Sequence, residues 1–362
     1  MKALAVEDVG QRIVEWYSCI ITKDVKQAKK LKPEVDLMIV NMEPDDKMLA
    51  YYQLVSMQYD LLMLKVSPAE AKANLDVTIL ENIASQSDDY LKFMYYYVWG
   101  RNEFYHKRYK SAIRTYKVAE RLIEKVNDPV EKAEFYQKLG ISYYHIDQYT
   151  FAFSYIEQAL EIFEKDPSYI INVFTCKHIL SGIYSELHQH EKAGAIYNEL
   201  LIDTVPYPYN YAITNYNIGV NKITKKEYGN AIEYFMRAAE IQEFQSSVVY
   251  YKAKYHLINL QMRLGNYTEG LEKLEDELHN KGNSEIIAKL MICRGLYLED
   301  DYSLIEQGLE VLESNEYFNE CRAMGEEISE HYEENGDLKT VAYFADYIKE
   351  MKSKNILGVD QA

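Results

Sequence analysis

The sequence predicts an all-α protein in which an N-terminal three-helix bundle is followed by a right-handed α-solenoid of paired helices. A frame of glycine, tyrosine and alanine recurs at nearly even spacing between Tyr95 and Glu240. The 362 residues include only 7 prolines and 15 glycines, as long helices require. A hydrophobic content of 48%, with 35 tyrosines, suffices to bury a continuous seam between stacked repeats.

The recurring frame describes two amphipathic helices that meet at a tight turn. Its fullest copy reads Gly140-x-x-Tyr143-x5-Tyr149-x-x-Ala152-x3-Ile156-x-x-Ala159. Small residues stand where the helices must touch, and rings fill the gaps between them. The marker alanines of successive copies, 40, 41 and 38 residues apart, are Ala112, Ala152, Ala193 and Ala231. The pattern resembles the tetratricopeptide repeat (TPR), a helix-turn-helix unit of about 34 residues, here with longer connections.

Three helices are predicted before the repeats. The first covers residues 7–22, and the apolar residues that share one face are Val9, Ile13, Trp16 and Ile20. The second begins after Asp24, a favourable N-cap, and Pro33 marks either a kink or a later start. The third covers residues 48–66 and ends at Ser67-Pro68, because proline disfavours helical geometry in the preceding residue.

The predicted organisation is a bundle over residues 1–66, a polar linker over 67–89, a TPR solenoid over 90–351 and a frayed tail over 352–362. Beyond Glu240 the repeat frame weakens but persists. Its turn positions there are Gly265, Tyr267 and Gly270, a degraded unit at 295–309, and Asn335-Gly336-Asp337 before the last repeat.

The composition and the motifs of the sequence disfavour several kinds of partner and site. A net charge of −17 disfavours a nucleic-acid partner held by phosphate contacts. Four scattered cysteines without a CxxC favour buried reduced thiols: Cys19, Cys176, Cys293 and Cys321. No signal-peptide core and no run of about 20 apolar residues occurs, so we expect a cytoplasmic protein with no membrane partner. We expect no cofactor and no metal, because phosphate-loop and nucleophile-elbow motifs are absent and His188-x-His190 alone is weak support.

The N-terminal unit carries a further resemblance. Val9-Gly10, Glu15-Trp16-Tyr17 and the stretch from Met42-Glu43-Pro44-Asp45-Asp46-Lys47 to Tyr51-Tyr52 resemble the Rap family of Gram-positive spore-formers. That family joins a three-helix bundle to a TPR solenoid, which matches this layout over nearly the whole chain. The resemblance implies a receptor for a short signalling peptide that binds a response regulator. Such a receptor either hydrolyses the regulator's aspartyl phosphate or blocks its DNA-binding domain, and bound peptide makes the bundle and linker rearrange and release the regulator.

The same resemblance implies that Glu43, Asp45 and Asp46 bind the response regulator. Phosphatase members carry a glutamine that orients the attacking water, and ungapped matching puts Asp46 there, which puts catalysis in doubt. Pro44 also replaces a family acidic residue. Two interpretations of Asp46 are open: it is a catalytic residue that positions water, or Asp45 and Asp46 cap a helix that begins at Lys47.

Three residues are predicted to bind the peptide. Asn217 lies on the first helix of its repeat, whose face lines a TPR groove, and its amide can donate to and accept from a peptide backbone at once. The family uses an asparagine in this same motif to hold the peptide, and Asn221 lies one turn further on. Glu186 matches a family acidic position that pairs with a basic peptide side chain. The plainer interpretations are surface asparagines and a solvated helix-end charge.

Two further alternatives concern the bundle and the whole chain. The basic residues of the second helix form either a patch that steers an acidic regulator or a solvated face: Lys26, Lys29, Lys30 and Lys32. For the chain as a whole, the alternative to a peptide-gated regulator is a TPR scaffold that binds partner proteins and has no chemistry of its own. A peptide-responsive transcription factor is disfavoured by the net charge and by the lack of a helix-turn-helix before the repeats.

Overall fold

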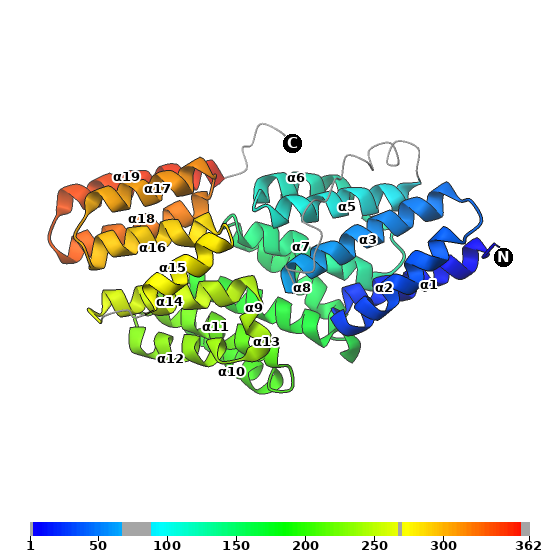
Figure 1. Ribbon diagram of the computed structural model, residues 1–362, viewed down its shortest axis with the longest axis horizontal. Helices are drawn as coiled ribbons and strands as arrows, with labels where there is room; N and C mark the ends of the chain where they lie inside the picture. Colours follow the sequence, from blue (N-terminus) through cyan, green and yellow to red (C-terminus); the bar gives the residue numbers. More distant parts are fainter. Residues whose placement is uncertain (1–2, 67–87, 267–269, 356–362) are drawn as a thin grey trace. The chain divides into compact units, whose positions relative to one another are not determined.

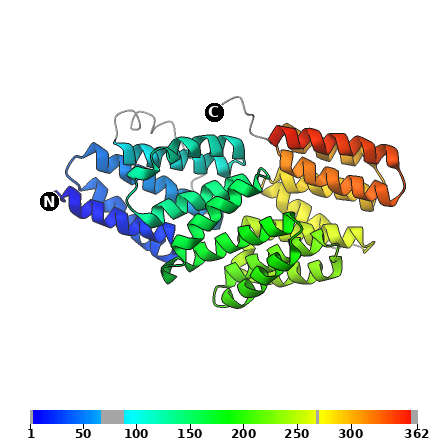
Figure 2. The same ribbon diagram turned by 180° about the vertical axis from the view of Figure 1, so that it is seen from behind.

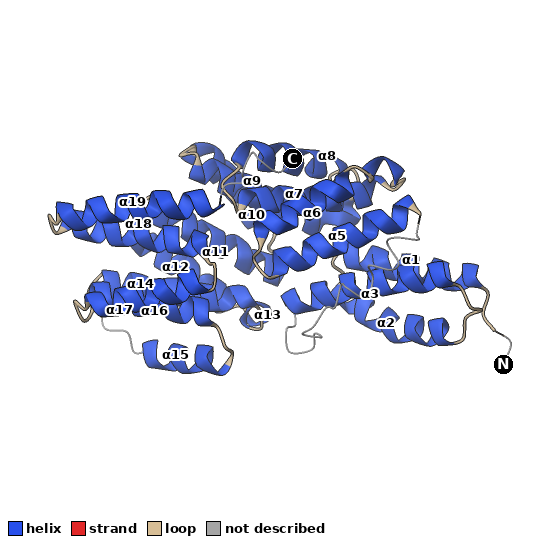
Figure 3. Ribbon diagram, turned by 90° about the horizontal axis from the view of Figure 1, so that it is seen from above, coloured by secondary structure: helices blue, strands red, loops and turns tan. Residues whose placement is uncertain are grey.

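The computed structural model describes residues 3–66, 88–266 and 270–355, and within these ranges the chain is helical. Figure 3 shows helices and loops only, and the described residues add a single backbone bridge, between Leu4 and Met42. The predicted all-α fold class is confirmed. The predicted break at Ser67-Pro68, most of the linker, the turn residue Tyr267 and the end of the tail lie outside the described residues. The chain divides into two compact units, Met1–Thr204 and Val205–Ala362.

The bundle helices open the first unit. They are α1 (Val6–Ile21), α2 (Val25–Val40) and α3 (Asp46–Val66), and they pack on one another (Figure 1). Trp16 is fully buried between them, and its indole Nε1 donates to the Ala28 carbonyl at 3.1 Å. The Asp24 side chain accepts from the Gln27 backbone N–H at 3.0 Å, which confirms the predicted cap. Because α2 runs from Val25 through Pro33, the alternative of a later helix start is wrong.

Three helix pairs complete the first unit. They are α5 (Asp89–Tyr105) with α6 (Tyr109–Glu120), α7 (Pro129–Tyr144) with α8 (Tyr149–Phe163), and α9 (Ile170–Glu186) with α10 (His190–Asp203). Two 3-10 turns, η3 (Ile123–Lys125) and η4 (Pro167–Tyr169), lie in the connections. Asp88 caps α5 by accepting from the Leu91 N–H at 3.0 Å, so Asp89, predicted to lie in the linker, is helical.

The second unit continues the pairing (Figure 2). Its helices are α11 (Pro208–Thr224), α12 (Tyr228–Ala239), α13 (Gln242–Gln245), α14 (Val248–Arg263), α15 (Leu271–Asn280), α16 (Ser284–Tyr297), α17 (Tyr302–Ser314), α18 (Phe318–Glu334) and α19 (Leu338–Asn355). The unit that looked degraded in sequence is a well-packed pair, α16 and α17. Because α19 continues to Asn355, Lys352 belongs to a helix and not to a frayed tail.

The repeat frame marks the helix contacts in both units. All four marker alanines are fully buried: Ala112, Ala152, Ala193 and Ala231. A Cβ added at Gly140 would lie 2.8 Å from the Ile156 side chain, and one at Gly219 would lie 2.8 Å from the Phe235 ring. The small residues are therefore required where two helices approach most closely, and the predicted register is confirmed.

Each helix pair turns through one residue with a left-handed backbone. We call it the turn residue, and in four pairs it is Lys107 (φ 61), Asp147 (φ 59), Asp300 (φ 50) and Gly336 (φ 80). In each of these four pairs it stands two residues before the second helix begins. This shared position allows residues of different repeats to be compared directly.

Candidate functional site

The predicted response-regulator-binding residues lie in the loop between α2 and α3 and at the first residue of α3. Backbone hydrogen bonds fasten this loop to the start of the chain: Leu4 N–H donates to the Asn41 carbonyl at 2.8 Å, and Glu43 N–H donates to the Leu4 carbonyl at 3.0 Å. Asp45 accepts from the Met48 N–H at 2.7 Å. The loop is therefore held at both ends, while the Glu43 side chain is exposed.

Asp46 is the first residue of α3, so that helix begins two residues before the predicted start at 48 and one before the Lys47 start of the capping interpretation. The capping interpretation holds for Asp45, whose carboxylate accepts the backbone N–H, and not for Asp46. Asp46 is exposed and makes no hydrogen bond or ion pair with any described residue. Its negative charge in the first turn suits the positive end of the helix, and its carboxylate can accept a proton or hold a water. The catalytic role stays a prediction.

Exposed apolar side chains flank the acidic loop. Leu37 and Val40, near the end of α2, are 66% and 81% exposed, and Leu49, in α3, is 41% exposed. We call these three residues together with Glu43 and Asp46 the loop surface. Apolar side chains left in water beside exposed carboxylates are typical of a surface that binds another protein.

The four lysines of α2 do not act as one patch. Lys32 pairs with Asp36 at 2.6 Å and lies over the Trp16 and Tyr52 rings at 5.3 and 5.5 Å. Lys26 and Lys30 are exposed. Lys32 therefore helps to hold the bundle together and does not belong to the solvated face.

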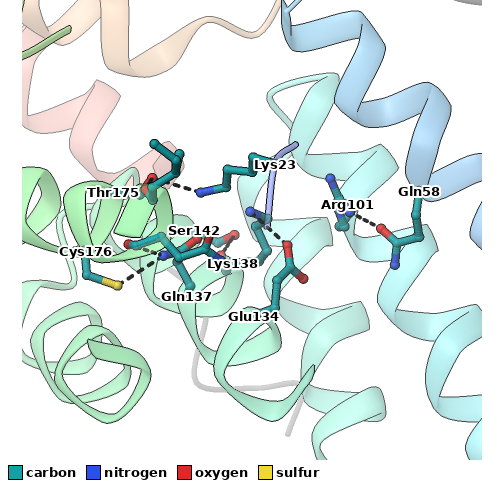
Figure 4. Close-up of polar contacts among 11 residues, drawn as sticks. Lys23, Gln58, Arg101, Glu134, Gln137, Lys138, Ser142, Thr175 and Cys176 are labelled. Atoms are coloured by element: carbon teal, nitrogen blue, oxygen red, sulfur yellow. Dashed lines mark hydrogen bonds and ion pairs between the residues drawn. The ribbon is translucent and has the colours of Figure 1, made fainter. Parts of the chain in front are cut away.

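Polar contacts join the bundle to the first repeats, and Figure 4 shows them. Lys23, the turn residue between α1 and α2, donates through Nζ to Thr175 Oγ1 of α9 at 2.9 Å. Arg101 of α5 donates to Gln58 Oε1 of α3. Burial lowers the pKa of Arg101, and the described residues offer its guanidinium no carboxylate. We call these contacts the bundle seam.

A buried carboxyl completes the bundle seam. Glu131, in the first turn of α7, is 4% exposed and accepts from Tyr90 Oη of α5 at 3.0 and 3.2 Å. Burial raises its pKa from 4.5 to about 7, partly offset by hydrogen bonds from Tyr90 and from Tyr17 of α1. One carboxyl thus touches side chains from two other helices, and its charge depends on pH near neutrality.

The predicted peptide-binding residues differ in their surroundings. Asn217, on α11, is half-buried, and its amide makes no hydrogen bond with any described residue. Asn221 is only 5% exposed, which leaves little of it for a ligand to touch. Glu186 ends α9, is exposed, and accepts from Tyr149 Oη at 3.4 Å. Glu186 belongs to the first unit and the two asparagines to the second.

Metal and membrane sites find no support in the described ranges. No group of three His, Cys, Asp or Glu side chains that could hold a metal ion occurs there, and the His188 and His190 rings stand 5.8 Å apart. The cysteines form no disulfide, and Cys176, Cys293 and Cys321 are buried as predicted, whereas Cys19 is half-buried. Within residues 3–66, 88–266 and 270–355, no helix combines the length and apolar character that a bilayer crossing needs.

Sequence reasoning missed the bundle seam entirely. Glu131 follows Asp128-Pro129, so it looks like an ordinary solvated acid in a first helical turn. Arg101 looks like one of many surface arginines. No local signal marks either residue as buried, because the partners of both come from helices more than 40 residues away, at separations of 41 and 43.

Comparison with known proteins identifies one matching family model and several similar sequences. A family model described as response regulator aspartate phosphatase H, N terminal, matches residues 3–64. Response regulator aspartate phosphatase I of Bacillus subtilis (strain 168) is 28% identical over 339 residues, which cover 91% of this chain and 87% of that protein. A protein from Rhodococcus hoagii named type II methyltransferase M.CeqI is 34% identical over 379 residues, which cover 99% of this chain and 70% of that protein.

Two solved structures share the fold. The crystal structure of a Rap protein complexed with competence and sporulation factor has a TM-score of 0.87 at 26% identity, and covers 96% of this chain and 99% of that chain. The apo form of RapI has a TM-score of 0.65 at 26% identity, and covers 96% and 98%.

Proposed function

This chain belongs to the Rap family, and we propose from that premise that it is a peptide-gated regulator that binds a response regulator through the loop surface. The observation that carries the proposal is the loop surface itself. Backbone bonds to Leu4 hold it in place, and it presents Glu43 and Asp46 to solvent beside exposed apolar side chains. A rigid surface of this kind loses little conformational entropy when a partner binds.

The proposed outcome for the regulator is sequestration, with weak or absent dephosphorylation. The aspartyl phosphate already carries negative charge, and Asp46 brings a further carboxylate to its oxygens. A neutral glutamine holds the attacking water without that repulsion. Aspartate is also one methylene shorter, and a misplacement of about 1 Å can cost roughly 100-fold in rate. A loose phosphoryl-transfer transition state gains little from a base, so proton acceptance by Asp46 does not compensate.

The proposed peptide contacts use Asn217 and, 31 residues earlier in the chain, Glu186 of the preceding repeat. The Asn217 amide has no partner among the described residues, so a peptide backbone can take both its donor and its acceptor. The exposed Glu186 carboxylate can form a charge-assisted bond with a basic peptide side chain. Asn221 is proposed only as a secondary contact because it is buried.

The bundle seam supplies a route from peptide to bundle inside the first unit. Glu186 and Thr175 lie on the same helix, α9, and Thr175 accepts from Lys23 between α1 and α2. A peptide that shifts α9 therefore acts directly on a residue that holds the bundle. The peptide can shift the balance between the formed and the broken contact only by as much as its affinity differs between those two states.

The test of partner binding uses purified receiver domains phosphorylated with acetyl phosphate. The parent protein should retain at least one such domain, and Glu43→Lys should reduce the retained amount about tenfold, because it reverses a charge at the loop surface. Glu157→Lys, an exposed charge reversal on α8, is the matched control and should bind like the parent. If no receiver domain binds the parent, or if both variants behave alike, the proposal fails in favour of a TPR scaffold for other proteins.

A further inference from the structure

An open pocket of about 480 Å³ lies in the second unit between the α16–α17 turn and the end of α18. We call it the turn pocket. Its walls include the rings of Tyr297, His331 and Tyr332 and the carboxyl groups of Asp300 and Asp337. No lysine or arginine lines it. Nothing in the proposed function uses this pocket.

At the corresponding place in the first unit, three rings pack together. There His145 stacks on Tyr109, with ring centroids 4.4 Å apart and planes 3° apart, and lies 5.4 Å from Phe104. Counted from the turn residues, Tyr109 corresponds to Tyr302, and His145 corresponds to Glu334. The tyrosine is kept, whereas the histidine position holds Glu334, whose carboxylate lies 3.9 Å from Arg263 Nη2 and does not line the pocket.

The turn pocket therefore combines open space, aromatic faces and negative charge. Tyr332 lies between the two acidic turns: burial, then Asp300 and then Asp337, raise the pKa of its hydroxyl. Asp300 is exposed at the rim. Asp337 is exposed too, although it also accepts from Thr340 Oγ1 at 2.6 Å at the start of α19. Aromatic faces attract cations, and carboxylates pair with them.

Exposed apolar side chains extend this surface beyond the pocket. Leu298, which lines the pocket itself, is 45% exposed, and Tyr302, Leu338 and Tyr343 are 40%, 72% and 60% exposed. Large apolar side chains left exposed beside a pocket are typical of a binding surface.

We propose that the turn pocket is a docking site for an arginine side chain carried by a basic segment of a partner protein. The planar guanidinium can stack on a tyrosine ring while its N–H groups pair with a carboxylate, and the compact ammonium of lysine cannot do both equally well. A second copy of this chain is the disfavoured occupant. With a net charge of −17, it would bring further carboxylates to an acidic pocket.

The test measures fluorescence anisotropy of a dye-labelled Gly-Arg-Gly-Arg-Gly amide against the full chain. Every protein carries Glu186→Gln, so that the proposed signalling-peptide contact does not contribute to binding of the probe. Peptides with glutamine or lysine in place of arginine are the matched probes. The arginine peptide should bind more tightly than the lysine peptide, and the glutamine peptide should not bind.

Two substitutions locate the binding in the turn pocket. Asp300→Asn keeps a residue that tolerates the left-handed turn conformation, and it should weaken the arginine peptide about fivefold. Tyr332→Leu removes a ring and should lower the affinity for the arginine peptide by a similar factor. The control is Asp346→Asn, an exposed change elsewhere on α19, which should leave that affinity unchanged. Equal binding of the arginine and glutamine peptides, equal binding of the arginine and lysine peptides, or indifference to both pocket variants would overturn the proposal. So would a concentration-dependent dimer that Tyr332→Leu abolishes. None of these outcomes bears on receiver-domain binding.

Discussion

The buried carboxyl of Glu131 should make the stability of the first unit depend on pH between about 4.5 and 7. Burial raises its pKa from 4.5 to about 7, so between those values the folded chain keeps a proton that the unfolded chain has lost. Stability from this group is complete below pH 4.5, falls as the pH rises through the window, and is lost above 7. A gap of that size corresponds to about 3 kcal/mol in the free energy of unfolding.

The perturbation is Glu131→Gln, which keeps the shape of the side chain and removes its titration. Both tryptophans of the chain, Trp16 and Trp99, belong to the first unit, so their fluorescence follows that unit alone during urea unfolding. The difference in unfolding free energy between variant and parent should grow in favour of the variant by about 3 kcal/mol from pH 4.5 to pH 8.

The control is Glu124→Gln, an exposed change in η3, which should track the parent at every pH. Titration of other groups changes the unfolding free energy of all three proteins equally, so it cancels in the differences between them. If the Glu131→Gln and parent curves stay parallel between pH 4.5 and 8, the carboxyl is not buried against Tyr90 as described, and the reasoning is wrong.

Three further predictions address the register and the sites. Ala152→Leu should overpack a closed helix contact and cost ~1–3 kcal/mol, which thermal unfolding detects as a fall of about 2–4 °C per kcal/mol; an unchanged Tm would mean that the repeat register is wrong. Asp46→Gln should accelerate loss of radiolabelled phosphate from the bound receiver domain, whereas rapid loss with the parent that Asp46→Ala abolishes would make Asp46 the catalytic residue. Glu186→Arg should weaken basic peptides far more than neutral ones in calorimetric titration; equal affinity of both for the parent would remove Glu186 from the site.

The fold was largely predictable because its signals are local. Asp24 caps α2 by accepting from the backbone N–H of Gln27, only three residues further on. Ala152 belongs to a spacing pattern that packing must satisfy in every repeat. The end of the last helix was misjudged because a charged, polar segment such as Lys352–Lys354 looks the same in a helix and in a tail.

The candidate site was only partly predictable. Loop residues such as Glu43 carried a motif, but the bundle seam did not. Its contacts join residues 43 and 152 positions apart, Gln58 with Arg101 and Lys23 with Thr175, and no short-range pattern encodes such pairs. The difference between the two units, Glu334 at the position of His145, becomes visible only when the turn residues align the repeats.

The central claim, that a peptide controls regulator binding, is tested most directly by release. A receiver domain bound to the immobilised parent is exposed to increasing cognate peptide, chosen from a synthetic library by its affinity for the parent. The account predicts that the peptide releases the domain from the parent. Asn217→Ala should bind the same domain equally well but need at least about tenfold more peptide to release it, because it lacks the amide contact. Retention of the domain by the parent at saturating peptide, or release from Asn217→Ala at the same peptide concentration, would contradict the account.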